Sequence, residues 1–132
     1  MDYVRTSHSK HCLMVHLIFV CKYRKQLLVK CGNLVKQFLY DISDEHNLNV
    51  VEMEVDKDHI HILVQYSPTQ SILEIVRLYK QISTYRLWNS FQVDYLEKCF
   101  WKEHTFWTDG YFVCSVGNVS EEMPRKYIEN QG

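Results

Sequence analysis

Apolar residues in the first part of the chain form a strand-like block followed by a helix-like stripe. Residues 11–21 are mostly apolar and rich in Val, Ile and Phe, which predicts a central strand. After Gly32, apolar positions recur at helical spacing and predict an amphipathic helix of about three turns, capped by Asn33 and ending near Asn47. The apolar stripe of this helix comprises Leu34, Val35, Phe38, Leu39 and Ile42.

A strand hairpin is predicted next, because two strand-like segments flank a short polar turn at Asp56 and Lys57. Residues 48–55 alternate between apolar and acidic side chains, so the two kinds occupy opposite faces of a strand. Residues 58–65 form the second strand of the hairpin. On the first strand, the apolar face is Val51, Met53 and Val55, and the acidic face is Glu52 and Glu54.

A second helix is predicted from Ser71 to about Asn89, after a loop at 66–70. Ser71 and Glu74 have the spacing of a capping box, in which each side chain bonds a backbone N–H of the first turn. An apolar stripe follows at helical spacing, and Tyr79 on this stripe is expected in the core. The stripe comprises Ile72, Ile75, Val76, Tyr79 and Ile82.

The last third of the chain has a weaker pattern. Residues 91–108 fit no single element, and a short strand is expected near 105–108. Residues 111–116 predict a strand that ends at Gly117, and a polar helix is expected over 119–131. The predicted order of elements is therefore strand, helix, strand, strand, helix and strand, followed by a final helix.

The first six elements match the ferredoxin-like β-α-β-β-α-β pattern. We therefore expect an α+β fold with an antiparallel sheet, to which a C-terminal helix is added. Residues 1–132 are expected to form one domain, with 1–10 flexible and 119–131 as the final helix. A length of 132 residues and a hydrophobic content of 46% suit one domain with a core of its own.

Charge and cysteine content narrow the function classes. The net charge of −1 argues against nucleic-acid binding by bulk charge, so any DNA contact must come from local patches. The five cysteines are odd in number and lack Cys-x-x-Cys spacing, which excludes a zinc ribbon and a disulfide framework. With no secretory signal and no apolar stretch of membrane length, a cytoplasmic protein without a membrane partner is expected.

One local patch interleaves an aromatic ring with cations. Lys22-Tyr23-Arg24-Lys25 follows the first predicted strand, and these four residues are candidates for DNA contact through charge and base stacking. A solvated strand end is the alternative interpretation of the same residues. A second patch is expected if the second helix forms, from Arg77, Lys80 and Arg86.

The sequence Asp58-His59-Ile60-His61 offers a pair of metal ligands. Side chains alternate along a strand, so His59 and His61 would point to one face while Ile60 packs in the core. Two imidazoles two residues apart on one face can hold one metal ion. The alternative is that both histidines are ordinary surface residues of a half-buried strand.

Tyr127 and Gln131 are candidates on the final helix. They are four residues apart and would share one helix face. The surrounding segment is strongly polar, so Tyr127 is not an obvious core residue, unlike Tyr79. A half-exposed packing role for Tyr127 is the alternative.

Three segments in chain order resemble the single-tyrosine HUH transposases, where HUH stands for His, a hydrophobe and His. More narrowly, they resemble the insertion-sequence 200/605 family. The resemblance covers almost the whole chain. The segments are Val20-Cys21-Lys22-Tyr23-Arg24-Lys25, Glu54-Val55-Asp56-Lys57-Asp58-His59-Ile60-His61-Ile62-Leu63 and Tyr127-Ile128-Glu129-Asn130-Gln131.

This resemblance implies a transposase that nicks and rejoins single-stranded DNA at the ends of an insertion sequence, next to DNA hairpins. It implies that His59, His61 and Gln131 are metal ligands and that Tyr127 is the nucleophile. It also implies a homodimer, in which the tyrosine helix of one subunit can complete the metal site of the other. A joint at Gly117 would allow that exchange.

Two imidazoles and an amide oxygen suit Mg²⁺ or Mn²⁺, and Mn²⁺ tolerates nitrogen ligands more readily. Two alternatives are a non-catalytic hairpin-DNA-binding protein derived from a transposase and a rolling-circle-type nickase. A zinc hydrolase with His-x-His on a strand is a third alternative, but barrel versions need about 250 residues.

Overall fold

A four-stranded antiparallel sheet with the strand order β4-β5-β3-β6 forms the frame of the protein. The computed structural model describes residues 4–5, 10–11, 13–116 and 127–131. The strands of the sheet are β3 (Leu13–Val20), β4 (Asn49–Val55), β5 (His59–Tyr66) and β6 (Phe112–Ser115). Two short strands, β1 (Val4–Arg5) and β2 (Lys10–His11), pair separately.

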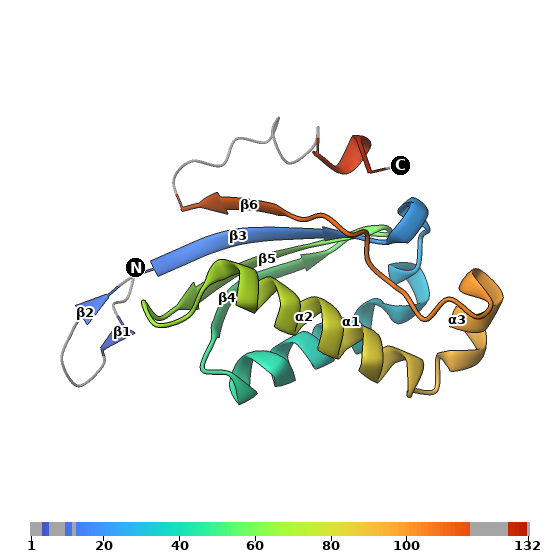
Figure 1. The fold of residues 1–132 in the computed structure, drawn as a ribbon, viewed down its shortest axis with the longest axis horizontal. Coiled ribbons are helices and arrows are strands. Elements are labelled where there is room, and N and C mark those ends of the chain that lie inside the picture. The colour runs from blue at the N-terminus through green and yellow to red at the C-terminus, as the bar shows by residue number, and fades with distance from the viewer. Residues whose placement is uncertain (1–3, 6–9, 12, 117–126, 132) are drawn as a thin grey trace.

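Two long helices, α1 (Leu28–Glu45) and α2 (Ile72–Trp88), lie on one side of the sheet, and the C-terminal turn lies on the other (Figure 1). A short helix, α3 (Val93–Phe100), precedes β6. The chain order β3-α1-β4-β5-α2-β6 and the position of β3 between β5 and β6 are those of a ferredoxin-like sheet. The predicted α+β fold and its element order are therefore confirmed.

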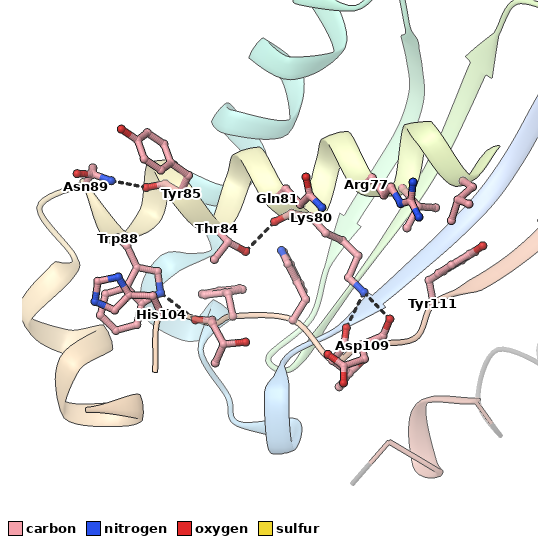
Figure 2. A pocket seen from close by; sticks show the side chains of 16 residues that line it. Arg77, Lys80, Gln81, Thr84, Tyr85, Trp88, Asn89, His104, Asp109 and Tyr111 are labelled. Atoms are coloured by element: carbon pink, nitrogen blue, oxygen red, sulfur yellow. Dashed lines mark hydrogen bonds between the residues drawn. The ribbon is translucent and has the colours of Figure 1, made fainter. Parts of the chain in front are cut away.

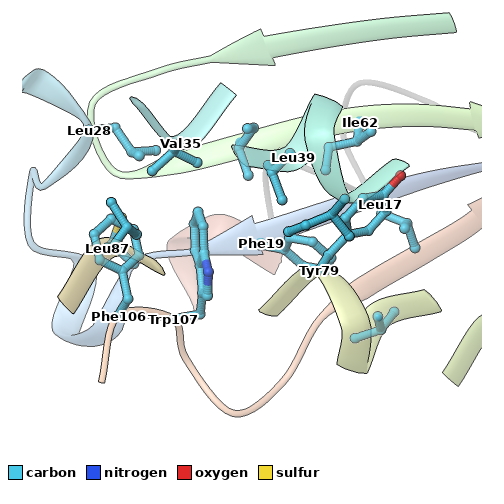
Figure 3. Packing of buried hydrophobic residues seen from close by; sticks show 14 of the residues in the cluster. Leu17, Phe19, Leu28, Val35, Leu39, Ile62, Tyr79, Leu87, Phe106 and Trp107 are labelled. Carbon is cyan, nitrogen blue, oxygen red and sulfur yellow. The ribbon is translucent and has the colours of Figure 1, made fainter. Parts of the chain in front are cut away.

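The core lies between the sheet and the helices α1 and α2 (Figure 3). Alternate residues of β5, namely Ile60, Ile62 and Val64, are fully buried on this side. Tyr79 is fully buried as well, and its hydroxyl lies 2.8 Å from Ser43 Oγ. Burial raises the pKa of Tyr79 to about 12, although the Ser43 hydrogen bond opposes the rise, so this tyrosine is a core residue as predicted.

Helix α1 begins earlier than predicted, at Leu28, so Asn33 is not its N-cap. Leu28 and Cys31 are buried and add an apolar first turn to the stripe. Gly32 is tolerated inside the helix because strand β4 passes close to it. A Cβ at position 32 would lie 3.2 Å from Val55 Cγ1.

Strand β4 contains a bulge that reverses one predicted side chain. The pairing of β4 with β5 shifts register between Val50 and Glu52. Val51 is therefore 47% exposed, whereas Val50 packs against the core. The prediction that Val51 shares the face of Met53 and Val55 is wrong, because a bulge adds one residue to one strand only.

The Ser71 cap of α2 is confirmed, since Ser71 Oγ accepts a hydrogen bond from the Glu74 backbone N–H at 3.0 Å. Helix α3 was not predicted, although it buries Leu96 and Phe100. The strand expected near 105–108 is reduced to one isolated bridge, between Trp107 and Cys21.

Cys21, Cys31, Cys99 and Cys114 are free thiols, as predicted for these positions. Cys12, Gly117, Lys126 and most of the N-terminal segment 1–10 lie outside the described residues. Of the predicted final helix, residues 127–131 are described, and 127–129 are helical. No helix within the described part of the chain is long and apolar enough to cross a membrane.

Candidate active site

His59 and His61 lie on the face of the sheet opposite α1 and α2. In the pairing of β3 with β5, His59 stands opposite Val20 and His61 opposite Ile18. Ile60, between them, is fully buried on the helix side. The predicted shared face is therefore confirmed, while the role of the two imidazoles as ligands remains a prediction.

The imidazole of His59 is held by a carboxylate. Its Nδ1 lies 2.8 Å from Asp58 Oδ1, and Asp58 Oδ2 lies 3.3 Å from Arg24 Nε. Burial alone would raise the pKa of Asp58, but the hydrogen bonds from His59 and Arg24 outweigh it and hold this pKa below its ordinary value. Asp58 is therefore ionised at neutral pH and accepts from both partners.

The imidazole of His61 contacts a histidine that sequence reasoning missed. His16 Nδ1 lies 2.7 Å from His61 Nε2, and the ring centroids are 4.9 Å apart. Desolvation lowers the pKa of both histidines, and the His16 ring adds to the decrease for His61, so both are neutral at neutral pH. His16 shares a face with Ile18, two residues on, and the pairing of β3 with β5 was needed to place it beside His61.

The two histidines line a cavity of about 220 Å³. Nearby carboxylates Glu52 and Glu54 act on His61, where they oppose the fall of its pKa. Within the described residues, however, no group of three or more His, Cys, Asp or Glu side chains could hold a metal ion. Among the described residues, a further ligand beyond the two imidazoles would therefore be of another kind, such as an amide oxygen. The cavity is lined by Ile18, Glu54, Val55, Asp56, His59, His61 and Ile128.

The C-terminal turn reaches this cavity through Ile128, the neighbour of Tyr127. Tyr127 itself packs beside β6, with its ring centroid 5.8 Å from that of Phe112. Neither Tyr127 nor Gln131 is among the residues that line the histidine cavity. Within this single subunit, the predicted nucleophile and third ligand are therefore near the predicted metal pair but not joined to it.

The hydroxyl of Tyr127 is buried close to the loop before β6. A Cβ on Gly110 would lie 3.5 Å from it. Burial raises the pKa of Tyr127, and the nearby Thr108 hydroxyl partly offsets the rise. Both hydroxyl oxygens are nevertheless buried without a well-formed hydrogen bond inside the described chain, so this phenol is protonated at neutral pH.

The predicted DNA patch 22–25 forms a 3-10 turn, η1 (Lys22–Arg24), in which Tyr23 is 60% exposed. Its cations point to different partners. Lys22 Nζ lies 3.6 Å from Asp109 Oδ1, and Arg24 contacts Asp58. Lys25 Nζ lies 5.9 Å from the ring centroid of Phe100. The four residues are therefore near one another, but their charges are not gathered into one free patch.

A cavity of about 610 Å³ lies between α2 and the segment 104–111 (Figure 2). We call it the α2 groove. Arg77, Gln81 and Tyr85 occur at four-residue steps along its helical wall, and Tyr85 is 71% exposed. Its aromatic end is Trp88 stacked on His104, with ring centroids 4.2 Å apart.

The second basic patch expected on α2 does not form as a unit. Lys80 Nζ donates hydrogen bonds to the carbonyl oxygens of Thr108 and Asp109, which Figure 2 shows, and to that of Gly110. Arg86 forms two hydrogen bonds to the Glu45 carboxylate, of 2.6 and 2.8 Å. Of the three predicted cations, Arg77 alone has no hydrogen bond or ion pair within the described residues, because the others meet carbonyl and carboxylate oxygens that the sequence does not place beside them.

Comparison with known proteins identifies relatives along most of the chain. Residues 9–131 match the family model described as "Transposase IS200 like". The ISDra2 transposase TnpA of Deinococcus radiodurans is 33% identical over 120 residues, which cover 90% of this chain and 84% of that protein. The transposase for insertion sequence element IS200 of Salmonella typhimurium is 28% identical over 126 residues, covering 95% of this chain and 80% of that protein.

Solved structures agree with this relationship. A crystal structure of a transposase from Deinococcus radiodurans R1 superposes with a TM-score of 0.86 at 30% identity, covering 97% of each chain. A tyrosine transposase bound to a REP hairpin has the same fold at 14% identity, with a TM-score of 0.56 over 98% of this chain and 69% of that one. Since the family match spans nearly the whole sequence, this chain belongs to the IS200-like transposases.

Proposed function

We propose that this transposase nicks and rejoins single-stranded DNA at the ends of an insertion sequence through a 5′-phosphotyrosine on Tyr127. The observation that carries the proposal is the meeting of two segments at one cavity. His59 and His61 line it from β5, and Ile128, next to Tyr127, lines it from the C-terminal turn. The family membership supports DNA cleavage and joining in general.

The residues at this cavity suit a divalent ion. His59 and His61 are the proposed ligands, with Gln131 as a third once its amide oxygen enters the cavity that Ile128 already lines. The lowered pKa of His61 keeps its imidazole neutral, as a metal ligand must be. This mixed nitrogen and oxygen set suits Mg²⁺ or Mn²⁺, and the bound ion would act as a Lewis acid toward the scissile phosphate.

Tyr127 is the proposed nucleophile, which exchanges one phosphodiester bond for another. Its phenolic oxygen forms a bond to phosphorus while the bond from phosphorus to the 3′ oxygen breaks. The phenol gives up its proton, and the departing 3′ oxygen takes one up, which leaves a 5′-phosphotyrosine and a 3′-hydroxyl. Because the new link is also a phosphodiester, a second 3′-hydroxyl can displace Tyr127 and rejoin DNA without ATP.

The proposal is tested with labelled single-stranded DNA from the ends of the element. Incubation with Mg²⁺ should yield a labelled adduct that survives denaturation, because the link is covalent. A rolling-circle-type nickase would also form the adduct, so the joined products are followed as well: only a transposase should join the two ends of one element to each other. A non-catalytic hairpin-binding descendant would retain the DNA without any adduct. Absence of adduct on correctly folded protein with its own ends would contradict the proposal.

We further propose that recognition is of hairpins with single-stranded flanks, and that the α2 groove contributes to it. A net charge of −1 gives little bulk attraction to duplex DNA. The groove offers the guanidinium of Arg77, which has no ion pair within the described residues, and an exposed ring on Tyr85, which suit phosphate contact and base stacking. The related transposase bound to a REP hairpin supports this class of partner.

In competition at physiological salt, a flanked hairpin should therefore displace a plain duplex of equal length. Arg77→Ala should weaken hairpin binding about fivefold to thirtyfold, the effect of losing roughly 1–2 kcal/mol of charged contact. Lys36→Ala on α1, which does not line the α2 groove, is the matched control and should bind like the unaltered protein. Equal affinity for hairpin and duplex would contradict hairpin recognition. Unchanged hairpin affinity in Arg77→Ala would show that the α2 groove does not take part in it.

We propose that the active unit is a homodimer in which Tyr127 of one subunit serves His59 and His61 of the other. The position of Tyr127 beside Phe112, outside the histidine cavity of its own subunit, supports such an exchange.

Complementation checks this arrangement. A His61→Ala subunit and a Tyr127→Phe subunit, each inactive alone, should regain adduct formation when mixed, because one of the two sites in a heterodimer is then intact. The adduct should form on the subunit that carries His61→Ala, the one that retains Tyr127. Heterodimers that stay inactive would instead indicate that Tyr127 acts within its own subunit.

A further inference from the structure

The side chain of His59 is fixed from one side by its neighbour in sequence. His59 Nδ1 lies 2.8 Å from Asp58 Oδ1, and the Asp58 side chain is only 17% exposed. A carboxylate accepts hydrogen bonds and does not donate them, so Nδ1 of His59 must carry a hydrogen, and in a neutral ring it is the only ring nitrogen that does. The lone pair of the ring is therefore on Nε2, and no hydrogen bond to that atom occurs within the described residues.

Asp58 is itself held on two sides by the turn η1. Its second carboxylate oxygen lies 3.3 Å from Arg24 Nε, and its backbone carbonyl accepts the Cys21 N–H at 2.8 Å. Arg24 reaches back toward β5 because η1 turns sharply, with φ of 59° at Tyr23 and 52° at Arg24. Arg24, Asp58 and His59 therefore form one chain of contacts that ends at the histidine cavity.

We propose that Asp58 and Arg24 are positioning residues of the metal centre, where Asp58 holds His59 in the tautomer that presents Nε2 to a divalent cation and Arg24 orients Asp58. The inference rests on the proposed function, because it requires His59 to be a ligand. It gives Arg24 a role at the metal centre in place of the DNA contact predicted from the sequence.

The physical reason is that an unheld imidazole rotates and exchanges between two tautomers. Only one tautomer, in one orientation, can present Nε2 to an ion in the cavity. A carboxylate bonded to Nδ1 selects both the tautomer and the ring orientation, and it makes Nε2 a stronger electron-pair donor to the metal. Losing such a partner typically lowers metal affinity by about 10-fold to 100-fold. His61 is oriented separately, through His16, so the effect of Asp58 should be confined to His59.

Mn²⁺ binding, followed by electron paramagnetic resonance on the full chain without DNA, gives a readout independent of cleavage. Asp58→Ala should weaken Mn²⁺ binding by about 10-fold to 100-fold. Asp58→Asn, which keeps an acceptor oxygen without the charge, and Arg24→Ala should each cause a smaller loss in the same direction. Arg86→Ala breaks a surface pair with Glu45 instead and should leave the affinity unchanged.

Histidine ¹⁵N spectra of the metal-free protein test the tautomer directly. The unaltered His59 should carry its hydrogen on Nδ1, whereas Asp58→Ala should shift the ring toward the Nε2–H form. A hydrogen on Nε2 in the unaltered protein would overturn the proposal even if Asp58→Ala failed to fold.

Hairpin binding in EDTA separates the two roles of Arg24. The proposal expects Arg24→Ala to bind hairpin DNA normally while Mn²⁺ affinity falls. Weakened hairpin binding with unchanged Mn²⁺ affinity would instead make Arg24 a DNA contact. If the unaltered protein bound no Mn²⁺, the proposed metal site would fail. If it bound Mn²⁺ and both Asp58 variants bound it equally well, only the positioning role would fail.

Discussion

Tyr127→Phe should abolish the covalent DNA adduct while leaving folding and hairpin binding intact. The substitution removes only the hydroxyl, which is the atom proposed to attack phosphorus. Loss of a covalent nucleophile costs on the order of 10⁶-fold in rate, so no adduct should be detectable. Because the Tyr127 hydroxyl is buried without a well-formed hydrogen bond in the described chain, its removal should not lower the free energy of unfolding.

Tyr40→Phe is the matched control for this change. Tyr40 lies on α1, 42% exposed, and the same atom is removed far from the histidine cavity. Adduct formation should be unchanged in this variant. Persistence of the adduct in Tyr127→Phe would show that another residue is the nucleophile.

His59→Ala and His61→Ala should each abolish cleavage and reduce binding of Mn²⁺, and the double variant should show no specific binding. Each substitution removes one of the two imidazoles that line the cavity among the described residues. His61→Ala should also lower the stability of the fold more than a substitution of an ordinary surface residue does, because the His61 ring is hydrogen-bonded to His16. We expect a loss of about 1 kcal/mol in the free energy of unfolding for His61→Ala.

Isothermal titration with Mn²⁺, alongside cleavage assays with and without EDTA, checks this pair. His104→Ala, which removes an exposed histidine stacked on Trp88, should bind Mn²⁺ normally and serves as the control. Cleavage that continues in EDTA, or an unchanged Mn²⁺ affinity in the double variant, would contradict the assignment of His59 and His61 as metal ligands.

The fold could be predicted where side chains follow one strong periodicity. The strand 58–65 and the Ser71-capped helix were correct because alternation and capping are local signals. The errors arose where local signals conflict with packing. Gly32 and Asn33 suggest a helix start, but α1 begins six residues before Leu34, at the buried Leu28, and its added first turns also bury Cys31. Helix α3 has only eight residues, so its helical pattern of apolar positions is short. The aromatic residues of the next segment follow directly and hide that pattern.

The site could be predicted only in part, for a related reason. That His59 and His61 share a face follows from strand geometry alone. The His16 contact depends on the register between β3 and β5, which joins residues 45 positions apart. Likewise, the runs that contain Arg24 and Lys80 look equally basic in sequence. Only the fold shows that Arg24 meets a carboxylate and Lys80 a set of carbonyl oxygens.

The buried residues of strand β5 fix the direction in which His59 and His61 point. If β5 slid by one residue against its neighbours, both imidazoles would turn into the apolar layer and Ile60, Ile62 and Val64 would turn outward. Each expelled aliphatic side chain costs about 1.5–3 kcal/mol, which is enough in sum to forbid the slip. Alignment of His59 and His61 is thus enforced by residues that never meet DNA, so mutations of these core residues could misalign cleavage without touching the cavity.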